Sequence, residues 1–177
     1  MNIDKALERL QTFDNQGFYV FTKRDLRRLF FDDSDSGFKQ GVARLVKKGL
    51  LEQPTKGVYV YALSKNKGNR TVEKIAGALR KGEYNYISLE SALSGYGAIS
   101  QIPIDRITVM TTGRRGTFKT SYGVIEFTHT KRSPLEIIKH TIKTDHPLLM
   151  ATKEAAYRDL KRVGRNIEMV DRKAIDE

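Results

Sequence analysis

Near the amino terminus, three stretches carry hydrophobic side chains at helical spacing. They cover residues 2–13, 23–31 and about 36–48, and the apolar positions in each recur every three or four residues. A segment of Asp and Ser residues, 32–36, separates the second stretch from the third, and any of its members can cap the third helix. Gly49 is well placed to end that helix. The pattern predicts three amphipathic helices, with a turn between the last two.

Strand-like alternation follows Gly49. Residues 50–53 and 58–61 read as two strands, and the Pro-Thr-Lys-Gly segment 54–57 reads as the turn between them. A short strand over 18–21 is expected to pair with this hairpin. Helix, turn, helix and hairpin in this order indicate a winged helix-turn-helix, in which the hairpin is the wing.

The third helix has a polar face without a carboxylate. Phe38, Val42 and Leu45 form its apolar stripe, and the opposite face is basic around the small residue Ala43, which suits close approach to a DNA major groove. We expect base-edge contacts from Lys39, Gln40, Arg44 and Lys47, with the small Ala43 leaving room for the duplex. We expect phosphate contacts from Lys23, Arg24, Arg28 and Lys56, and we count Thr22 and Ser36 among the DNA-binding residues.

Two other interpretations of this basic helix stand beside DNA binding. A basic amphipathic helix is often a solvated surface, and a small helical unit with a hairpin can also serve protein contacts. The whole chain, however, carries a formal net charge of +11, and Lys56 lies at the hairpin tip. This combination favours a polyanionic partner, and double-stranded DNA in particular.

The pattern in the rest of the chain predicts a second domain built of short helices and strands. Residues 64–70, SKNKGNR, are polar and contain Gly, as linkers do. Beyond them, helical spacing alternates with strand-like spacing, and the last residues, 166–177, are weakly patterned and expected to fray. We expect helices over 71–80, 88–96, after Pro134 and over 152–163, antiparallel strands over 106–111, 116–122 and 124–129, and a connection over 99–104 stopped by Pro103.

These elements define an α+β chain of two domains. The prediction is a winged helix-turn-helix over residues 1–64, a linker over 65–70, and a small α+β domain with an antiparallel sheet over 71–177. Residues 1–64 hold 11 Lys and Arg against 8 Asp and Glu, a net charge of +3, which leaves 21 against 13, or +8, for residues 65–177. The second domain is therefore the more basic of the two.

Composition narrows the setting of the protein. The 177 residues include no Cys, so neither a disulfide nor a thiolate metal site is available. No apolar run approaches the ~20 residues of a membrane helix, and no apolar signal core opens the chain. We expect a cytoplasmic protein without a cofactor.

The second domain offers weak candidates for catalysis. Asp105, Glu126 and Lys131 lie in segments where a metal-dependent nuclease would place its residues, but the Glu-x-Lys pair is absent, and a surface Glu is the simpler interpretation. His140 and His146 are not at the spacing that places two imidazoles on one helix face. We predict no metal site and no enzymatic activity.

A second basic surface is also predicted in this domain. It comprises Arg114, Arg115, Lys119, Lys131 and Arg132, on or beside adjoining strands. Contact with flanking DNA or with RNA, and a merely solvated hairpin, explain its charge equally well.

The chain resembles the AbiEi-type antitoxins of type IV toxin-antitoxin systems. Four segments carry the likeness: LVKKGLLEQPTKGVYVY at 45–61, YISLESALSGYGAIS at 86–100, the strand pair at 106–118 and 123–134, and ATKEAAYRDL at 151–160. The resemblance implies a winged domain that binds inverted repeats in its own promoter and represses the operon. It also implies a carboxy-terminal domain that counteracts a nucleotidyltransferase-like toxin without a stable complex.

Two other functions remain compatible with the residues. One is a winged-helix transcription regulator whose second domain senses a ligand or dimerises, and the other is an RNA-directed module or enzyme. The operator, the toxin and the mechanism of neutralisation are not encoded in any motif of the chain. A monomer on each repeat and a homodimer on DNA both fit the sequence.

Overall fold

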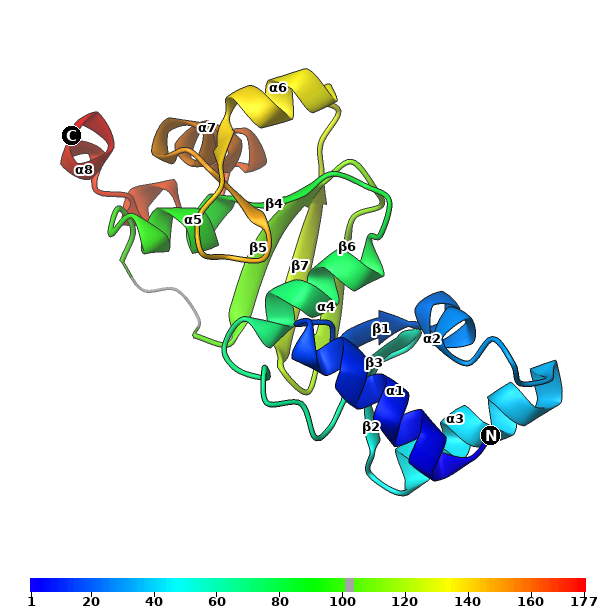
Figure 1. The fold of residues 1–177 in the computed structure, drawn as a ribbon. Helices are drawn as coiled ribbons and strands as arrows, with labels where there is room; N and C mark the ends of the chain where they lie inside the picture. The colour runs from blue at the N-terminus through cyan, green and yellow to red at the C-terminus, as the bar shows by residue number, and fades with distance from the viewer. Residues whose placement is uncertain (101–103) are drawn as a thin grey trace. The chain divides into compact units, whose positions relative to one another are not determined.

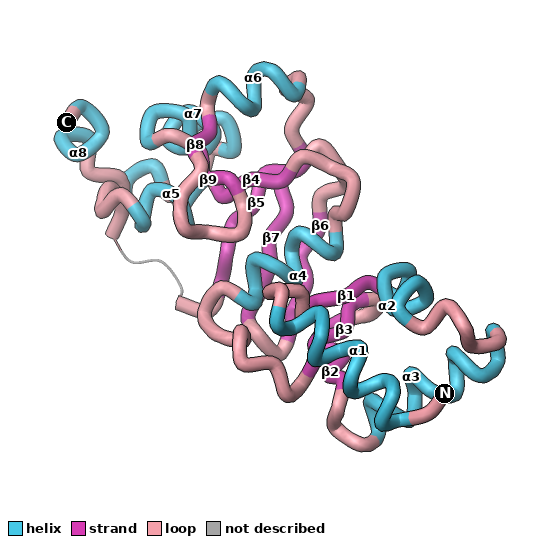
Figure 2. The backbone as a smooth tube through the Cα atoms, viewed as in Figure 1, coloured by secondary structure: helices cyan, strands magenta, loops and turns pink. Residues whose placement is uncertain are grey.

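The computed structural model describes residues 1–100 and 104–177, which form two compact units, Met1–Thr71 and Val72–Glu177 (Figures 1 and 2). The first unit contains the helices α1 (Ile3–Asn15), α2 (Lys23–Leu29) and α3 (Asp35–Lys47). Its strands are β1 (Val20–Thr22), β2 (Leu51–Thr55) and β3 (Val58–Tyr61), in the order β1-β3-β2 with antiparallel pairing. This is the predicted winged helix-turn-helix, and the predicted pairing of the first strand with the hairpin is confirmed.

The core of the first unit joins all three helices to the sheet. Leu10 of α1, Leu26 of α2, Leu45 of α3 and Val60 of β3 are completely buried. Burying side chains of this size stabilises the fold by roughly 1.5–3 kcal/mol each. The basic outer face of α3 is thus held by an apolar inner face, as the helical spacing predicted.

The segment interpreted as a linker packs on the first unit. Asp14, buried at the end of α1, accepts hydrogen bonds from the Ser64 hydroxyl and from the Asn66 amide nitrogen, the latter at 2.9 Å. The Tyr19 hydroxyl lies 2.9 Å from that of Thr71, the last residue of this unit. Residues 65–70 are therefore tethered at both ends.

The second unit is built on a six-stranded sheet with the order β6-β7-β5-β4-β9-β8. Its strands are β4 (Asn85–Ile87), β5 (Arg106–Thr111), β6 (Gly116–Thr120), β7 (Gly123–His129), β8 (Thr141–Ile142) and β9 (Leu149–Ala151). Its helices are α4 (Thr71–Leu79), α5 (Leu89–Gly95), α6 (Pro134–Lys139), α7 (Lys153–Val163), the 3-10 helix η1 (Ile167–Met169) and α8 (Arg172–Asp176). The α+β class is confirmed for the chain.

The predicted antiparallel pairing within this sheet is only partly right. β6 and β7 form the expected antiparallel hairpin, but β5 pairs with β7 in parallel, with Val109 opposite Phe127. β4 and β9, two short strands that the hydrophobic pattern did not reveal, also pair in parallel. The sheet is mixed because β6 is inserted between β5 and β7 in the sequence but lies outside them in space.

Two further expectations concern the ends of α5 and of the chain. The carboxy-terminal residues do not fray: Val170 forms a bridge with Ile99, and Ala174 and Ile175 pack against the core. Their hydrophobic positions are too few for a helical pattern, so only contact with the core reveals their role. Pro103, expected to stop the connection after α5, lies outside the described residues.

Helices cover both faces of the central strands. Thr108 of β5 exchanges hydrogen bonds with Ser91 of α5. The neighbouring pair Val109 and Phe127 faces the end of α4, where the guanidinium of the next residue, Arg80, lies 4.5 Å from the Phe127 ring centroid. Successive residues of a strand point to opposite faces of the sheet, so α4 covers one face and α5 the other. In Figure 1, α4 crosses in front of the sheet.

Candidate nucleic-acid interface

The turn between α2 and α3 is fixed by ion pairs. Asp32 binds Lys5 at 2.7 Å and Arg9 at 2.8 Å, both on α1, and these two cations hold the pKa of its carboxyl well below the usual value. Arg27 of α2 binds Asp35 at 3.2 Å and donates to the backbone carbonyl of Phe30. Two acidic side chains of the turn are therefore neutralised by basic residues away from the outer face of α3.

Capping sets the start of both helices of the motif. The Thr22 hydroxyl accepts a hydrogen bond from the Asp25 backbone N–H, and the Asp25 carboxylate accepts one from the Thr22 N–H, which completes the predicted capping box. Among the candidates for the next cap, the structure selects Ser34, whose hydroxyl accepts a hydrogen bond from Gly37 N–H at 3.1 Å. Ser36 consequently lies in the first turn of α3, exposed.

The outer face of α3 is exposed along its length. Lys39, Gln40, Ala43 and Lys47 are all exposed, and neither lysine has an ion-pair partner among the residues that the structure describes. Arg44 is exposed as well, but its guanidinium donates a hydrogen bond to the backbone carbonyl of Met1. The structure therefore brings together the predicted residues of α3 on one surface, with Arg44 engaged by the chain's own backbone.

A groove of about 350 Å³ runs beside this face, between α3 and the wing. Its floor is apolar, and its polar edges come from the start of α2, from α3 and from the two wing strands. It is lined by Lys23, Phe38, Lys39, Val42, Ala43, Val46, Gln53 and Tyr59. The predicted Lys23 and Lys39 thus share one groove although 16 positions separate them in the sequence.

The wing contributes the predicted Lys56 and two residues that the sequence did not indicate. Lys56 lies exposed at its tip, beside Gly57, whose φ of +83° is a conformation that favours glycine. Tyr59 of β3 lines the groove from a position that alternates with buried residues of its strand. Gln53 of β2 also lines the groove, but it has the same parity as the buried Leu51 and lies where the pairing of β2 with β3 shifts register.

The predicted second basic surface is divided by the sheet. Arg114 and Arg115 are exposed in the β5–β6 connection, next to Gly116, which pairs with Phe127 near the carboxyl end of β7. Lys119 pairs with Val124 at the opposite end of the same strand. Lys131 and Arg132 follow β7 and line a pocket with two residues of α7, Arg158 and Arg162. These two arginines belong to a basic cluster that the sequence did not assign.

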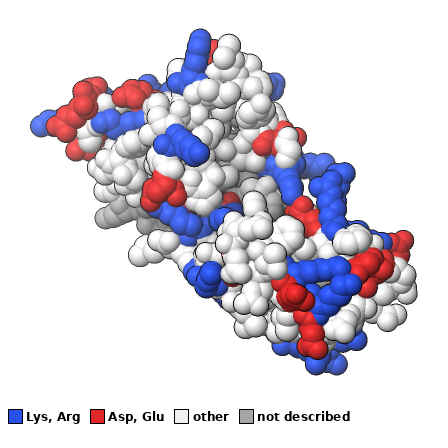
Figure 3. Space-filling model, in the orientation of Figure 1, with Lys and Arg blue, Asp and Glu red and all other residues white. Residues whose placement is uncertain are grey.

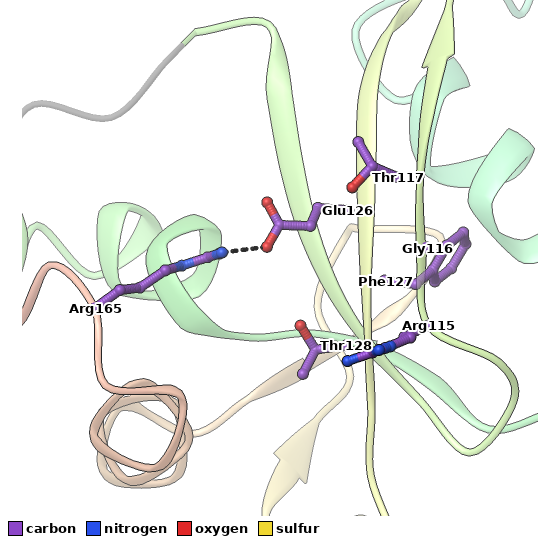
Figure 4. A pocket seen from close by; sticks show the side chains of 7 residues that line it. All are labelled: Arg115, Gly116, Thr117, Glu126, Phe127, Thr128 and Arg165. Atoms are coloured by element: carbon purple, nitrogen blue, oxygen red, sulfur yellow. Dashed lines mark ion pairs between the residues drawn. The ribbon is translucent and has the colours of Figure 1, made fainter.

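A more open hollow of about 570 Å³ lies over β6 and β7 (Figure 4). Its centre is Glu126, which binds Arg106 at 2.7 Å and also pairs with Arg165. Arg165 binds Glu90 of α5 at 2.7 Å, and the two carboxylates raise the pKa of its guanidinium. Burial raises the pKa of Glu90, but hydrogen bonds from Arg165 and Asn166 outweigh it, and the net shift is downward. Glu126 thus bridges Arg106 and Arg165.

The candidate nuclease residues lie far apart. The Asp105 carbonyl accepts a hydrogen bond from Val124 N–H at 2.7 Å, so Asp105 lies at the start of β7, whereas Lys131 follows the end of that strand. At ~3.3 Å per residue, the two are separated by roughly 20 Å. Asp105, Glu126 and Lys131 therefore form no common site.

His140 and His146 each lie beside a glutamate. His146 Nδ1 lies 2.7 Å from a Glu73 carboxylate oxygen, and His140 lies 3.5 Å from Glu136. Within residues 1–100 and 104–177, no three His, Asp or Glu side chains gather as metal ligands. In the same residues, no helix has the length and hydrophobicity to cross a bilayer.

The distribution of charge differs between faces of the molecule. On the face drawn in Figure 3, basic and acidic side chains lie beside one another over the first unit, as the pairs of Lys5 and Arg9 with Asp32 require. The outer face of α3 lacks such pairs among the described residues. A polyanion would therefore meet positive charge without paired carboxylates at this face of α3.

These features define the first unit as a winged helix-turn-helix of the kind found in transcription regulators. Residues 8–62 match the model of a protein family described as transcriptional regulator, AbiEi antitoxin. The match lies within the first unit and agrees with the suspected family; of the four segments that carry the resemblance, it includes the one at 45–61. The family description names a regulator and an antitoxin rather than an enzyme.

The fold is also similar to a solved structure. The crystal structure of the RV2827C protein from Mycobacterium tuberculosis matches 87% of this chain with a TM-score of 0.61 and 16% sequence identity. The chain covers 59% of the length of that protein, and the likeness concerns the fold alone. A comparison with curated proteins found no match.

Proposed function

We propose that this protein is a DNA-binding antitoxin that represses its own operon. The outer face of α3 would enter the major groove at inverted repeats in the promoter, and Lys56 of the wing would contact the phosphate backbone. The observation that carries this proposal is the exposed, carboxylate-free surface of Lys39, Gln40, Ala43 and Lys47 on the described α3. It is supported by the match of residues 8–62 to antitoxin regulators.

The roles of the individual residues follow from their chemistry. Gln40 can donate to and accept from an adenine edge, and Lys39 and Lys47 can donate to guanine. Ala43 leaves space for the duplex. Arg44 can reach a base only by leaving the Met1 carbonyl, so its contact with DNA would exchange one hydrogen-bond acceptor for another. Lys23, Arg24 and Arg28 of α2 would contact phosphates, together with the cap residue Thr22 and the exposed Ser36.

A gel-shift titration with the promoter fragment and an unrelated duplex tests the DNA-binding half. Gln40→Ala and Arg44→Ala should weaken promoter binding by about 1–3 kcal/mol each and leave the unrelated duplex unaffected. Lys56→Ala should weaken both and reduce the salt slope by about 0.9. Lys65→Ala removes one exposed charge from the same unit, outside the interface, and serves as control. Equal affinity of the intact protein for the two duplexes would refute sequence-specific binding.

A growth assay tests the antitoxin half. The full chain would be expressed with the neighbouring nucleotidyltransferase-like toxin, with no stable complex expected between them. The double variant Gln40→Ala/Lys56→Ala should lose repression of a promoter reporter and still restore growth, if toxicity is countered by the second unit. If the double variant lost both growth rescue and repression at equal toxin levels, a plain transcription regulator would be favoured instead.

A further inference from the structure

The second unit contains a small pocket lined only by cations. Its walls are Lys131 and Arg132, after β7, and Arg158 and Arg162, on the outer side of α7. Its volume is about 380 Å³, and like the hollow over β6 and β7 it is open to solvent. No aromatic or apolar residue lines it, so a ligand would meet the four charged groups and their aliphatic stems. We call these four residues the four-cation pocket.

Arg132, one of the four residues of the four-cation pocket, is held in place by a buried carboxylate. The Arg132 guanidinium binds the Asp159 carboxylate at 2.8 Å, and that carboxylate also accepts a hydrogen bond from Ser88 at 2.7 Å. Asp159 is only 1% exposed, and the side chain of Arg132 is 14% exposed. Because this carboxylate is buried and held by Ser88, the ion pair orients Arg132 before any ligand binds.

The charge of the pocket exceeds what its structural partner neutralises. Among the described residues, the four cations have one carboxylate partner, Asp159, which leaves an excess of three positive charges. Arg158 and Arg162 lie one helical turn apart, a spacing at which like charges destabilise a helix by a few tenths of a kcal/mol. An anion between them would relieve this repulsion. The arrangement is therefore unfavourable for the fold alone and favourable for an anionic ligand.

We propose that the four-cation pocket binds a compact polyphosphate, such as pyrophosphate or the phosphate chain of a nucleoside triphosphate. Guanidinium groups match phosphate oxygens in a bidentate geometry, and three of the four cations are arginines. A polyphosphate concentrates several negative charges in one group, as the pocket concentrates its cations. A nucleic-acid strand instead spreads single charges along its backbone. The inference is independent of promoter binding.

Isothermal titration calorimetry on the full chain, at an ionic strength of ~0.15 M, tests this proposal. Pyrophosphate and tripolyphosphate are the probes, and sulfate and a single-stranded RNA of equal phosphate concentration are the comparisons. We expect one site per chain for tripolyphosphate, and much weaker binding of sulfate. The double variant Arg158→Gln/Arg162→Gln should lose at least about tenfold in affinity, since two charge-assisted bonds are removed.

A matched variant separates the pocket from general charge attraction. Arg172→Gln/Lys173→Gln removes the same two charges from exposed positions of α8 and should leave the affinity within about twofold. Lys131→Gln gives a second pocket variant should the first one fold poorly by circular dichroism. No saturable polyphosphate binding, equal losses in the α8 and α7 variants, or tighter binding of the RNA than of tripolyphosphate would each overturn the proposal.

Discussion

The two basic regions of this protein differ in how their cations are held. On α3, Lys39 and Lys47 project from one helix with no ion pair among the described residues. In the second unit, Arg132 is fixed by a buried carboxylate, and Arg165 by Glu90 and Glu126. Lysines without ion-pair partners suit a long partner whose many contacts are each weak, whereas oriented arginines suit a ligand that binds at one place. Net charge alone does not distinguish these uses.

The largest expected effect concerns the buried anchor of the second unit. Asp159→Ala should lower the free energy of unfolding by about 3–5 kcal/mol, because Arg132 is left without its buried partner. Urea unfolding measures the change. Asp35→Ala, which breaks an Arg–Asp pair with the carboxylate 88% exposed, is the matched control and should cost less than about 1 kcal/mol. Similar losses in both variants would remove the distinction between the two regions.

Replacing Glu126 tests how much its ion pairs with two arginines contribute to stability. Glu126→Ala should cost about 1–3 kcal/mol in urea unfolding, since Arg106 and Arg165 lose an acceptor. The exposed Glu168 provides a control of equal charge, for which Glu168→Ala should have little effect. We expect neither the unaltered protein nor the Glu126→Ala variant to cleave RNA or DNA in the presence of Mg²⁺.

If the unaltered protein cleaved either nucleic acid and Glu126→Ala abolished the cleavage, the enzyme interpretation would be supported instead.

Two serines at the start of α3 separate folding from recognition. Ser34→Ala should destabilise the protein by about 1 kcal/mol in thermal or urea unfolding, because the cap on Gly37 N–H is lost. Ser36→Ala, two positions later and exposed, should leave stability unchanged and only weaken promoter binding if Ser36 contacts a phosphate. Destabilisation by Ser36→Ala of the same size as by Ser34→Ala would contradict the observed cap.

The smallest effect is a pH dependence at Asp14. Burial raises the pKa of this carboxyl, but hydrogen bonds from Ser64, Asn66 and the Lys65 N–H outweigh it, and the net shift is downward. A lowered pKa in the folded state stabilises the protein at pH values above about 4, the ordinary pKa of an Asp carboxyl. This stabilisation is lost as the pH falls through the lowered pKa. Asp14→Asn should therefore flatten the loss of stability below pH ~4 in urea unfolding. Asp105→Asn, at an exposed position, should leave that loss unchanged.

Local patterns were sufficient for the winged unit. The apolar stripe of α3, the Thr22 capping box and the turn at Gly57 all depend on residues within a few positions of one another. The basic outer face of α3 follows directly from helical spacing. Gln53 and Tyr59 were missed because their position beside α3 depends on how the hairpin packs.

The second unit shows what local patterns leave open. A strand's alternation does not say which strand it pairs with, so the parallel pairing of β5 with β7 could not be distinguished from an antiparallel one. The strands β4 and β9 span only three residues each, too few for a period to emerge. Residues 86–100 and 151–160 were noted separately, and they meet in the structure at the hydrogen bond between Ser88 and Asp159.

The sequence by itself determined the order of helices, turn and hairpin in the first unit, the basic face of α3 and the α+β class of the chain. Only the tertiary structure decided the mixed sheet, the packing of the carboxy-terminal residues, and the meeting of Lys131 and Arg132 with Arg158 and Arg162. The physical reason is the separation along the sequence of the residues that interact. Helical faces, caps and turns are set by neighbours in the chain, whereas strand pairing and charge clusters depend on contacts between segments that the sequence keeps far apart.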